Sequence, residues 1–181
     1  MGVRISGCPT AASAREREIA MGEATLLTDP LALESQVCFA LSLASRSVID
    51  AYRPVLEPLH LTHPQYLVML ALWEYAPMSV KQLAELLQLN PGTVSPLTKR
   101  LAALGYIERG RDEADERSLA IVLTERGAAL RKVAERIPGI MMRRLGMSAE
   151  EIVALHGTMM KVIAAANDVA PLADDEILVA P

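Results

Sequence analysis

The sequence predicts a mainly α-helical fold with a small β-wing: a winged helix-turn-helix with long dimerisation helices at its two ends. Three observations predict this fold. Two short amphipathic segments joined by a tight turn lie between residues 79 and 105. Two strand-like segments with a polar loop between them follow directly. Apolar residues at helical spacing dominate both flanks, residues 30–56 and 124–167.

The N-terminal part divides into an extension and a helix. Residues 1–28 mix glycine, serine, alanine and charged residues without a strong period, so we expect a flexible extension. Asp29 and Pro30 fit an N-cap followed by a proline in the first helical turn, where its missing N–H costs nothing. An apolar stripe then continues to about Leu56. We therefore predict one long helix over residues 30–56.

Capping signals mark two short helices in the middle of the chain. Ser79 followed by Gln82 is a capping box, which opens the first of them. Asn90 as N-cap and Pro91 in the first turn open the second. This second helix is expected to end at Gly105. Two short helices with a tight turn between them are typical of a helix-turn-helix.

The segment after these helices predicts a β-hairpin. Residues 106–109 and 118–123 are strand-like, and the intervening residues 110–117 are polar throughout. A helix-turn-helix followed by a hairpin is a winged helix, which we place at about residues 61–123. In such a domain the second helix enters the major groove of DNA, and the wing lies beside the phosphates or reaches the minor groove.

Two more helical segments follow the wing. A helix is expected from residue 124 to about residue 145, with a kink or break at Pro138. Ser148 and Glu151 form another capping box that opens the last helix. Residues 168–181 are short, acidic and proline-containing, so we expect a loose tail.

The chain length fits one domain, which we place at residues 29–167. The helices predicted at residues 30–56 and 124–167 carry more apolar surface than one winged helix can cover. This excess predicts a homodimer built from both ends of the chain. The alternative, in which these helices pack on their own domain, stays open.

Charge alone does not establish DNA binding. The net charge is −4, and six basic residues between positions 79 and 123 are matched by six acidic ones. A favourable surface must therefore come from the placement of side chains on the second helix and the wing. The alternative to DNA binding is that these charges form only a solvated face on a small α+β domain. The candidate DNA-binding residues are Thr93, Ser95, Pro96, Lys99, Arg100, Arg109, Arg111, Asp115 and Arg117.

The sequence carries no signals typical of membrane, secreted, metal-binding or nucleotide-binding proteins. No apolar run approaches the length of a membrane span, and the N-terminus lacks a signal-peptide core, so a cytoplasmic location is expected. His60, His63 and His156 are scattered, so we predict no metal site. There is no phosphate-binding glycine motif, and no cofactor is expected.

The two cysteines, Cys8 and Cys38, are too few for a disulfide scaffold and indicate a reducing compartment. The predicted helix puts Cys38 in mid-helix among apolar residues. No positive charge lies within one helical turn of it, so the local sequence favours an inert, buried thiol.

Long contiguous motifs then point to a family. Residues 115–124, DERSLAIVLT, resemble the wing signature of the MarR family of winged-helix regulators. Residues 38–74 and 90–118 resemble OhrR, the branch of that family that senses organic hydroperoxides. The resemblance covers about residues 34–131. It implies a dimer with intertwined terminal helices that binds double-stranded DNA carrying an inverted repeat.

The resemblance also assigns roles to three residues. Cys38 matches the peroxide-sensing cysteine, whose oxidation to a sulfenic acid releases such repressors from DNA. Tyr52 matches one of the tyrosines that hold this cysteine, and a second one falls at His63, a departure from the family pattern. His63 can donate a hydrogen bond or, as an imidazolium, favour the thiolate. The alternative is that Tyr52 and His63 make polar contacts at helix ends.

Geometry limits how these residues meet. The fourteen residues from Cys38 to Tyr52 span roughly 21 Å of straight helix, so the contact requires the other subunit of a dimer. No cysteine follows the wing. The resolving thiol is therefore Cys8, if the extension folds back, or a low-molecular-weight thiol.

These observations together predict a homodimeric repressor that releases its operator when an organic hydroperoxide oxidises Cys38. One alternative is a MarR-type repressor released by a small aromatic or phenolic ligand, with Cys38 structural. A thiol peroxidase is a weaker alternative, because such enzymes usually place an activating arginine close to the thiol. We therefore expect a regulator and not an enzyme.

Overall fold

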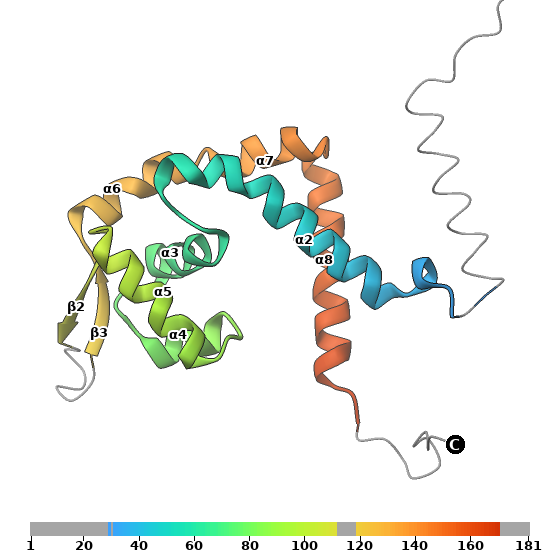
Figure 1. Ribbon diagram of the computed structural model, residues 1–181, viewed down its shortest axis with the longest axis horizontal. Coiled ribbons are helices and arrows are strands. Elements are labelled where there is room, and N and C mark those ends of the chain that lie inside the picture. The colour runs from blue at the N-terminus through green and yellow to red at the C-terminus, as the bar shows by residue number, and fades with distance from the viewer. Residues whose placement is uncertain (1–28, 30, 112–118, 171–181) are drawn as a thin grey trace, which may run out of the picture. The chain divides into compact units, whose positions relative to one another are not determined.

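The computed structural model describes residues 29, 31–111 and 119–170 and shows a mainly helical chain with one small antiparallel sheet (Figure 1). The chain divides into two compact units, residues 1–50 and 51–181, with the boundary inside α2. The elements in order are η1 (Leu33–Ser35), α2 (Val37–Leu56), η2 (Glu57–Leu59), α3 (His63–Tyr75), β1 (Met78–Ser79), α4 (Val80–Leu86), α5 (Pro91–Ala103), β2 (Ile107–Arg111), β3 (Leu119–Leu123), α6 (Glu125–Ala134), α7 (Ile137–Leu145) and α8 (Ala149–Asn167).

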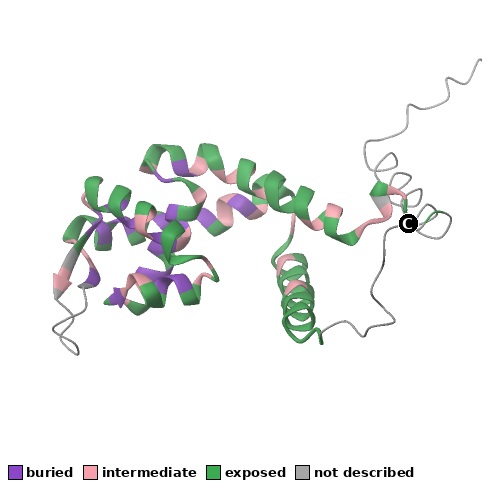
Figure 2. Cartoon of the chain, turned by 60° about the horizontal axis from the view of Figure 1, so that its bottom comes forward, coloured by how far each residue is buried: buried purple, intermediate pink, exposed green. Residues whose placement is uncertain are grey.

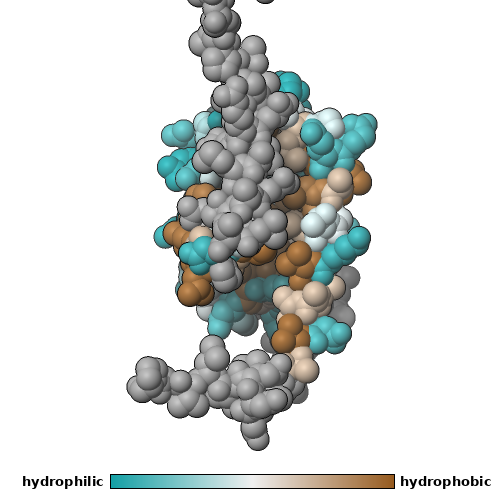
Figure 3. All heavy atoms as spheres, turned by 90° about the vertical axis from the view of Figure 1, so that its right-hand side faces the viewer, coloured by the Kyte–Doolittle hydropathy of each residue, from teal (hydrophilic) through white to brown (hydrophobic). Residues whose placement is uncertain are grey.

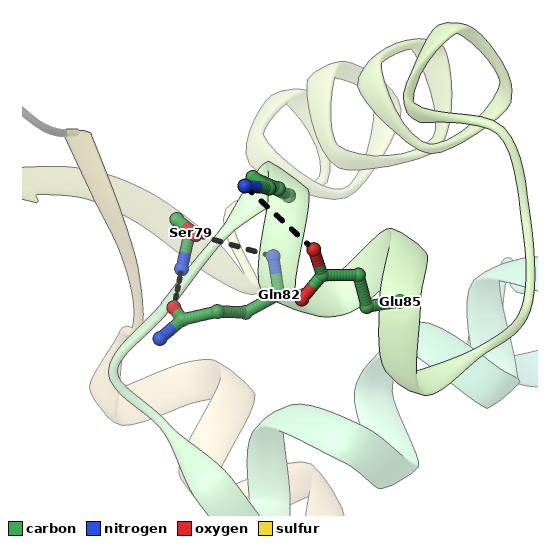
Figure 4. A network of polar contacts seen from close by, with 4 residues as sticks. Ser79, Gln82 and Glu85 are labelled. Atoms are coloured by element: carbon green, nitrogen blue, oxygen red, sulfur yellow. Dashed lines mark hydrogen bonds and ion pairs between the residues drawn. The ribbon is translucent and has the colours of Figure 1, made fainter.

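The helix-turn-helix forms as the capping signals predict. Ser79 Oγ accepts a hydrogen bond from the Gln82 N–H at 3.2 Å, and Gln82 Oε1 accepts from the Ser79 N–H at 2.7 Å (Figure 4). These bonds satisfy two N–H groups at the start of α4 that have no partner within the helix. Asn90 Oδ1 accepts from the Gly92 N–H at 2.8 Å and caps α5. Gly105 follows α5 with a φ of 72°, a conformation that glycine adopts without strain.

The wing is confirmed as a β2–β3 hairpin, and it is part of a three-stranded sheet of order β1-β3-β2. Ile107 pairs with Leu123 at the base of the hairpin. The sequence did not predict β1, whose Met78 pairs with Ile121, because two residues are too short for a recognisable period. Residues 112–118, which include most of the predicted loop, lie outside the described residues.

The core lies within the second unit, where α3, α4 and α5 pack together and against the sheet (Figure 1). Figure 2 shows buried residues gathered on these elements. Aliphatic side chains dominate this core. The largest fully buried side chains are Leu56, Val68, Met69, Leu72, Leu83, Val94, Leu101 and Ile121.

The predicted start of the first long helix is wrong. Asp29 Oδ1 accepts from the Leu31 N–H at 2.9 Å and so caps a turn. The short 3₁₀ turn η1 follows, and Gln36 then adopts an extended conformation that interrupts the helix. The regular helix α2 therefore begins only at Val37. Cys38 is consequently the second residue of α2 and does not lie in mid-helix.

The predicted helical region 124–167 is three helices. The expected break near Pro138 occurs slightly earlier, at Glu135 and Arg136. Pro138 is the second residue of α7, where it starts a helix and does not interrupt one. The last helix, α8, begins at the predicted capping box, in which Ser148 Oγ accepts from the Glu151 N–H at 3.2 Å.

Candidate nucleic-acid interface and redox site

The α5 helix has one buried and one exposed face. Val94, Thr98 and Leu101 are buried against the core. Among the predicted DNA-binding residues of α5, Thr93, Pro96, Lys99 and Arg100 are exposed, and Ser95 is half-buried. No Asp or Glu occurs in α5, so this face carries two positive charges without a negative one on the same helix. The local cationic surface that the net charge of the chain does not provide is therefore present on α5.

Pro96 lies inside α5 without ending it. Because proline has no N–H, the Gly92 carbonyl lacks its usual helical donor. Two residues further on, the buried Thr98 hydroxyl donates to the Ser95 carbonyl at 3.0 Å. This bond satisfies the hydroxyl within the helix, so a polar residue fits the core at this position.

The wing residues are only partly described. Arg109 and Arg111 lie in β2, where their backbones pair with Ile121 and Leu119 of β3. Asp115 and Arg117 lie outside the described residues.

The thiol of Cys38 is exposed. It lies in the first turn of α2, whose backbone N–H groups have no acceptors within the helix. The expectation of a buried thiol is therefore wrong for the single chain. An exposed thiol is accessible to an oxidant, which is one requirement of a reactive cysteine.

Tyr52 and His63 come together at the junction of α2 and α3. Their ring centroids are 5.1 Å apart in an edge-on arrangement. Tyr66, a buried core residue, lies 6.0 Å from Tyr52, and Trp73 lies 6.4 Å from Tyr66 by the same measure. The run of four rings therefore begins at the two proposed redox residues and continues along α3. Cys38 is fourteen residues from Tyr52 on the same helix, about 21 Å of rise, so it is remote from this pair in its own chain.

Burial sets the protonation of the Tyr52–His63 pair. It lowers the pKa of His63 and raises the pKa of Tyr52. Near neutral pH both side chains are therefore neutral hydrogen-bond donors. The alternative in which His63 acts as an imidazolium is thus disfavoured at that pH.

A cavity of about 400 Å³ lies between α3 and the end of α6. Apolar and aromatic side chains form most of its wall, and Glu74, Arg131 and Glu135 supply its charges. Arg131 faces Glu135 at 4.0 Å, and both side chains are largely exposed, so the pair adds little stability. The remaining lining residues are Tyr66, Leu70, Trp73, Ala134 and Pro138.

Other kinds of site are absent from the part of the chain that the structure describes. Its His, Cys, Asp and Glu side chains form no group of three or more that could hold a metal ion. Among its helices, none has both the length and the hydrophobicity that crossing a bilayer requires.

Comparison with known proteins places these features in a family. A family model described as the MarR family matches residues 61–119. The chain is 42% identical over 131 residues to the organic hydroperoxide resistance transcriptional regulator of Bacillus subtilis (strain 168), covering 72% of this chain and 89% of that protein. It is 43% identical over 123 residues to the HTH-type transcriptional regulator TtmR of Methylorubrum extorquens (strain PA1), covering 68% of this chain and 63% of that protein.

A solved structure supports the fold independently. The structure of reduced AbfR bound to DNA matches with a TM-score of 0.61 and 23% identity, covering 85% of this chain and 99% of that one. At this identity the likeness shows the winged-helix fold alone. The curated relatives are regulators and not enzymes, which confirms that prediction. Because 42% identity extends over more than two thirds of the chain, this protein belongs to the MarR family of transcriptional regulators.

Proposed function

We propose that this regulator is a DNA-binding repressor that senses organic hydroperoxides by oxidation of Cys38 and then releases its operator. The observation that carries the proposal is the exposed thiol of Cys38 in the first turn of α2. It occurs in a chain that is 42% identical to a regulator named for organic hydroperoxide resistance. Exposure gives the oxidant access, which a buried structural cysteine would not have.

The exposed face of α5 is the proposed reading surface. Thr93, Ser95 and Lys99 face base edges in the major groove, and the charges of Lys99 and Arg100 also neutralise nearby phosphates. The absence of acidic residues from α5 supports this role, because each carboxylate there would repel the phosphates. Pro96 shapes the same face. The wing supplies contacts to phosphate or the minor groove through the cations Arg109, Arg111 and Arg117.

The proposed repressor is a homodimer that binds an inverted repeat. Two winged-helix domains related by a two-fold axis bind half-sites about one helical turn, roughly 34 Å, apart. The support comes from α8, none of whose residues is buried although several are large and apolar. A second copy of the chain would cover this surface.

The proposed chemistry is a single oxidation. The Cys38 thiolate attacks the terminal oxygen of the hydroperoxide, the O–O bond breaks, and the alkoxide leaves and takes up a proton. Cys38 is thereby oxidised to a sulfenic acid and the hydroperoxide reduced to an alcohol. A second thiol then attacks the sulfenic sulfur, which forms a disulfide and releases water. A low-molecular-weight thiol or Cys8 supplies it.

Tyr52 and His63 are proposed to hold the thiolate across the dimer. Both are neutral donors near neutral pH, since burial raises the pKa of Tyr52 and lowers that of His63. Neither side chain makes a hydrogen bond within the described part of the chain, so both remain able to donate. Because Cys38 of the same chain is about 21 Å away along α2, they would serve the thiolate of the other protomer.

Operator release on titration with cumene hydroperoxide tests the proposal. Wild-type protein and Cys38→Ser, the matched control that keeps a small hydroxyl, are compared by gel shift. Both should bind the operator equally before oxidation. Wild-type protein should lose affinity after one equivalent of oxidant, and Cys38→Ser should not. Mass spectrometry of the wild-type protein should locate the added oxygen or mixed disulfide on Cys38.

One observation favours a second candidate function. The cavity between α3 and α6 has aromatic walls from Tyr66 and Trp73, which suit a small aromatic or phenolic ligand, and Arg131 and two glutamates supply its charges. In that case the ligand releases the operator and Cys38 is structural. Equal release from wild type and Cys38→Ser on oxidation would replace the redox proposal with this one.

A further inference from the structure

The root of the wing, defined here as Gly105, Tyr106, Thr124 and Gly127, is joined by a compact set of contacts. Thr124 Oγ1 donates to the Gly105 carbonyl at 2.7 Å and accepts from the Gly127 N–H at 3.0 Å. The Thr124 N–H donates to the Tyr106 carbonyl at 3.1 Å. A Cβ on Gly127 would overlap that carbonyl, so α6 lies directly against this backbone. The wing and the first turn of α6 are therefore one structural unit.

Two hydrogen bonds connect this root to α3, which carries His63, and to η2, which directly follows the helix of Tyr52. Trp73 Nε1, on α3, donates to the Gly127 carbonyl at 2.9 Å. The Tyr106 hydroxyl donates to the Leu59 carbonyl at 3.0 Å, and Leu59 ends η2, the segment between Tyr52 and His63. The root is thus held by one bond from α3 and by another to η2.

Ring contacts complete the connection on the α3 side. Trp73 lies 6.4 Å from Tyr66, and Tyr66 lies 6.0 Å from Tyr52, which itself lies 5.1 Å from His63. All three separations are within the range of interacting aromatic pairs. Contacts therefore run without interruption from the proposed redox pair to the wing.

We propose that Trp73 and Tyr106 are positioning residues that transmit a change at the Tyr52–His63 pair to the wing. This inference rests on the proposed function. Oxidation of the sensing thiol changes what Tyr52 and His63 contact. Interiors are densely packed and transmit displacement, so the rings of α3 and the Leu59 carbonyl shift together. The two hydrogen bonds pass that shift to the root and move the wing relative to α5.

Phenylalanine variants test the transmission. Tyr106→Phe removes only a hydroxyl donor, Trp73→Phe removes the indole N–H together with part of the ring system, and the double variant removes both donors. The measurement is the ratio of operator affinity before and after one equivalent of cumene hydroperoxide. Each single variant should reduce this ratio by about two- to tenfold, because the net contribution of one neutral hydrogen bond corresponds to a change of that size. The double variant should reduce it further. Tyr75→Phe, an exposed aromatic at the end of the same helix, is the control and should respond as wild type does.

A second readout does not require the Trp73 or Tyr106 variants to fold. Trp73 is the one tryptophan in the sequence, so intrinsic fluorescence reports its surroundings directly. Emission should change when the wild-type protein is oxidised and stay constant in Cys38→Ser. Suppose that oxidised wild type releases its operator. If both single variants then show the wild-type affinity ratio, or if Trp73 emission stays constant, the proposed transmission is wrong and the proposed function stands. If wild type keeps its operator after oxidation, the proposed function and the transmission both fall.

Discussion

Gly127 shows how one residue without a side chain fixes the wing. It packs against the Tyr106 carbonyl so closely that a Cβ would overlap the oxygen. Gly127→Ala must therefore push α6 away from the wing, and overpacking of this kind typically costs about 1–3 kcal/mol. Urea unfolding should show this loss in the free energy of unfolding. The control is Gly157→Ala on α8, where a Cβ meets nothing within 4 Å. It should stabilise by up to about 1 kcal/mol, because alanine is the better helix former.

His63 gives the protein a pH dependence whose sign follows from its burial. Burial lowers the pKa of His63 in the folded chain below its unfolded value. The unfolded state therefore binds the proton first, and stability is lost as pH falls from about 6.5 through the folded pKa. His63→Gln should flatten this part of the curve of unfolding free energy against pH. An identical slope in wild type and His63→Gln would contradict the assignment.

At the scale of elements, the sequence predicted best what is encoded locally. The capping box of Ser79 and Gln82 placed the start of α4 correctly, because its hydrogen bonds join residues three apart. The start of α2 was misplaced, since the extended backbone of Gln36 leaves no compositional signal. The strand β1 was missed because it exists only through its pairing with β3.

The candidate site shows the same difference between features encoded locally and features that depend on tertiary packing. The exposed residues of α5 were predictable from helical spacing once the buried face was known. The contact between Tyr52 and His63 was not, because it depends on how α3 packs against the end of α2. The bond from Trp73 to Gly127 joins residues 54 apart in the sequence, and no local pattern marks it. Resemblance to a family named Tyr52 and His63, but it did not name Trp73 or Tyr106.

The proposed role of α5 predicts a defined salt dependence. Lys99 is exposed on a helix without acidic residues, so its charge is available to DNA. Lys99→Ala should weaken operator binding and reduce the slope of log affinity against log salt by about one, the loss of one released counterion. Fluorescence anisotropy at several salt concentrations measures this slope. Lys161→Ala, on α8, removes the same charge elsewhere and should leave the slope unchanged. An unaltered slope for Lys99→Ala would exclude this surface from the interface.

For the whole molecule, the distribution of charge and apolar surface matters more than the totals. The chain carries a net charge of −4, yet its α5 helix carries only positive charge. Apolar residues make up 51% of the sequence, yet many large ones are exposed (Figures 2 and 3). Val153 of α8, for example, is 70% exposed. Such surface in a regulator is expected to be covered by a partner.

An apolar stripe on α8 identifies the surface for the last prediction. Five residues recur at helical spacing and so share one side of this helix, whereas Lys161 lies on the opposite side. In the single chain none of the five is buried. We expect a second copy of the chain to cover them in the dimer proposed above. The stripe consists of Ile152, Leu155, Met159, Val162 and Ile163.

Charge placed in the stripe should therefore separate the dimer. Leu155→Glu combined with Ile163→Glu puts two carboxylates into an apolar interface, where an unpaired charge is strongly unfavourable. Size-exclusion chromatography with light scattering should report a monomer of about 19.6 kDa. Operator affinity should fall when the dimer is lost, because one winged-helix domain alone contacts only half of an inverted repeat. Lys161→Glu introduces the same side chain on the other side of α8 and should remain dimeric. A double variant that stays dimeric with full operator affinity would show that α8 does not hold the two copies together.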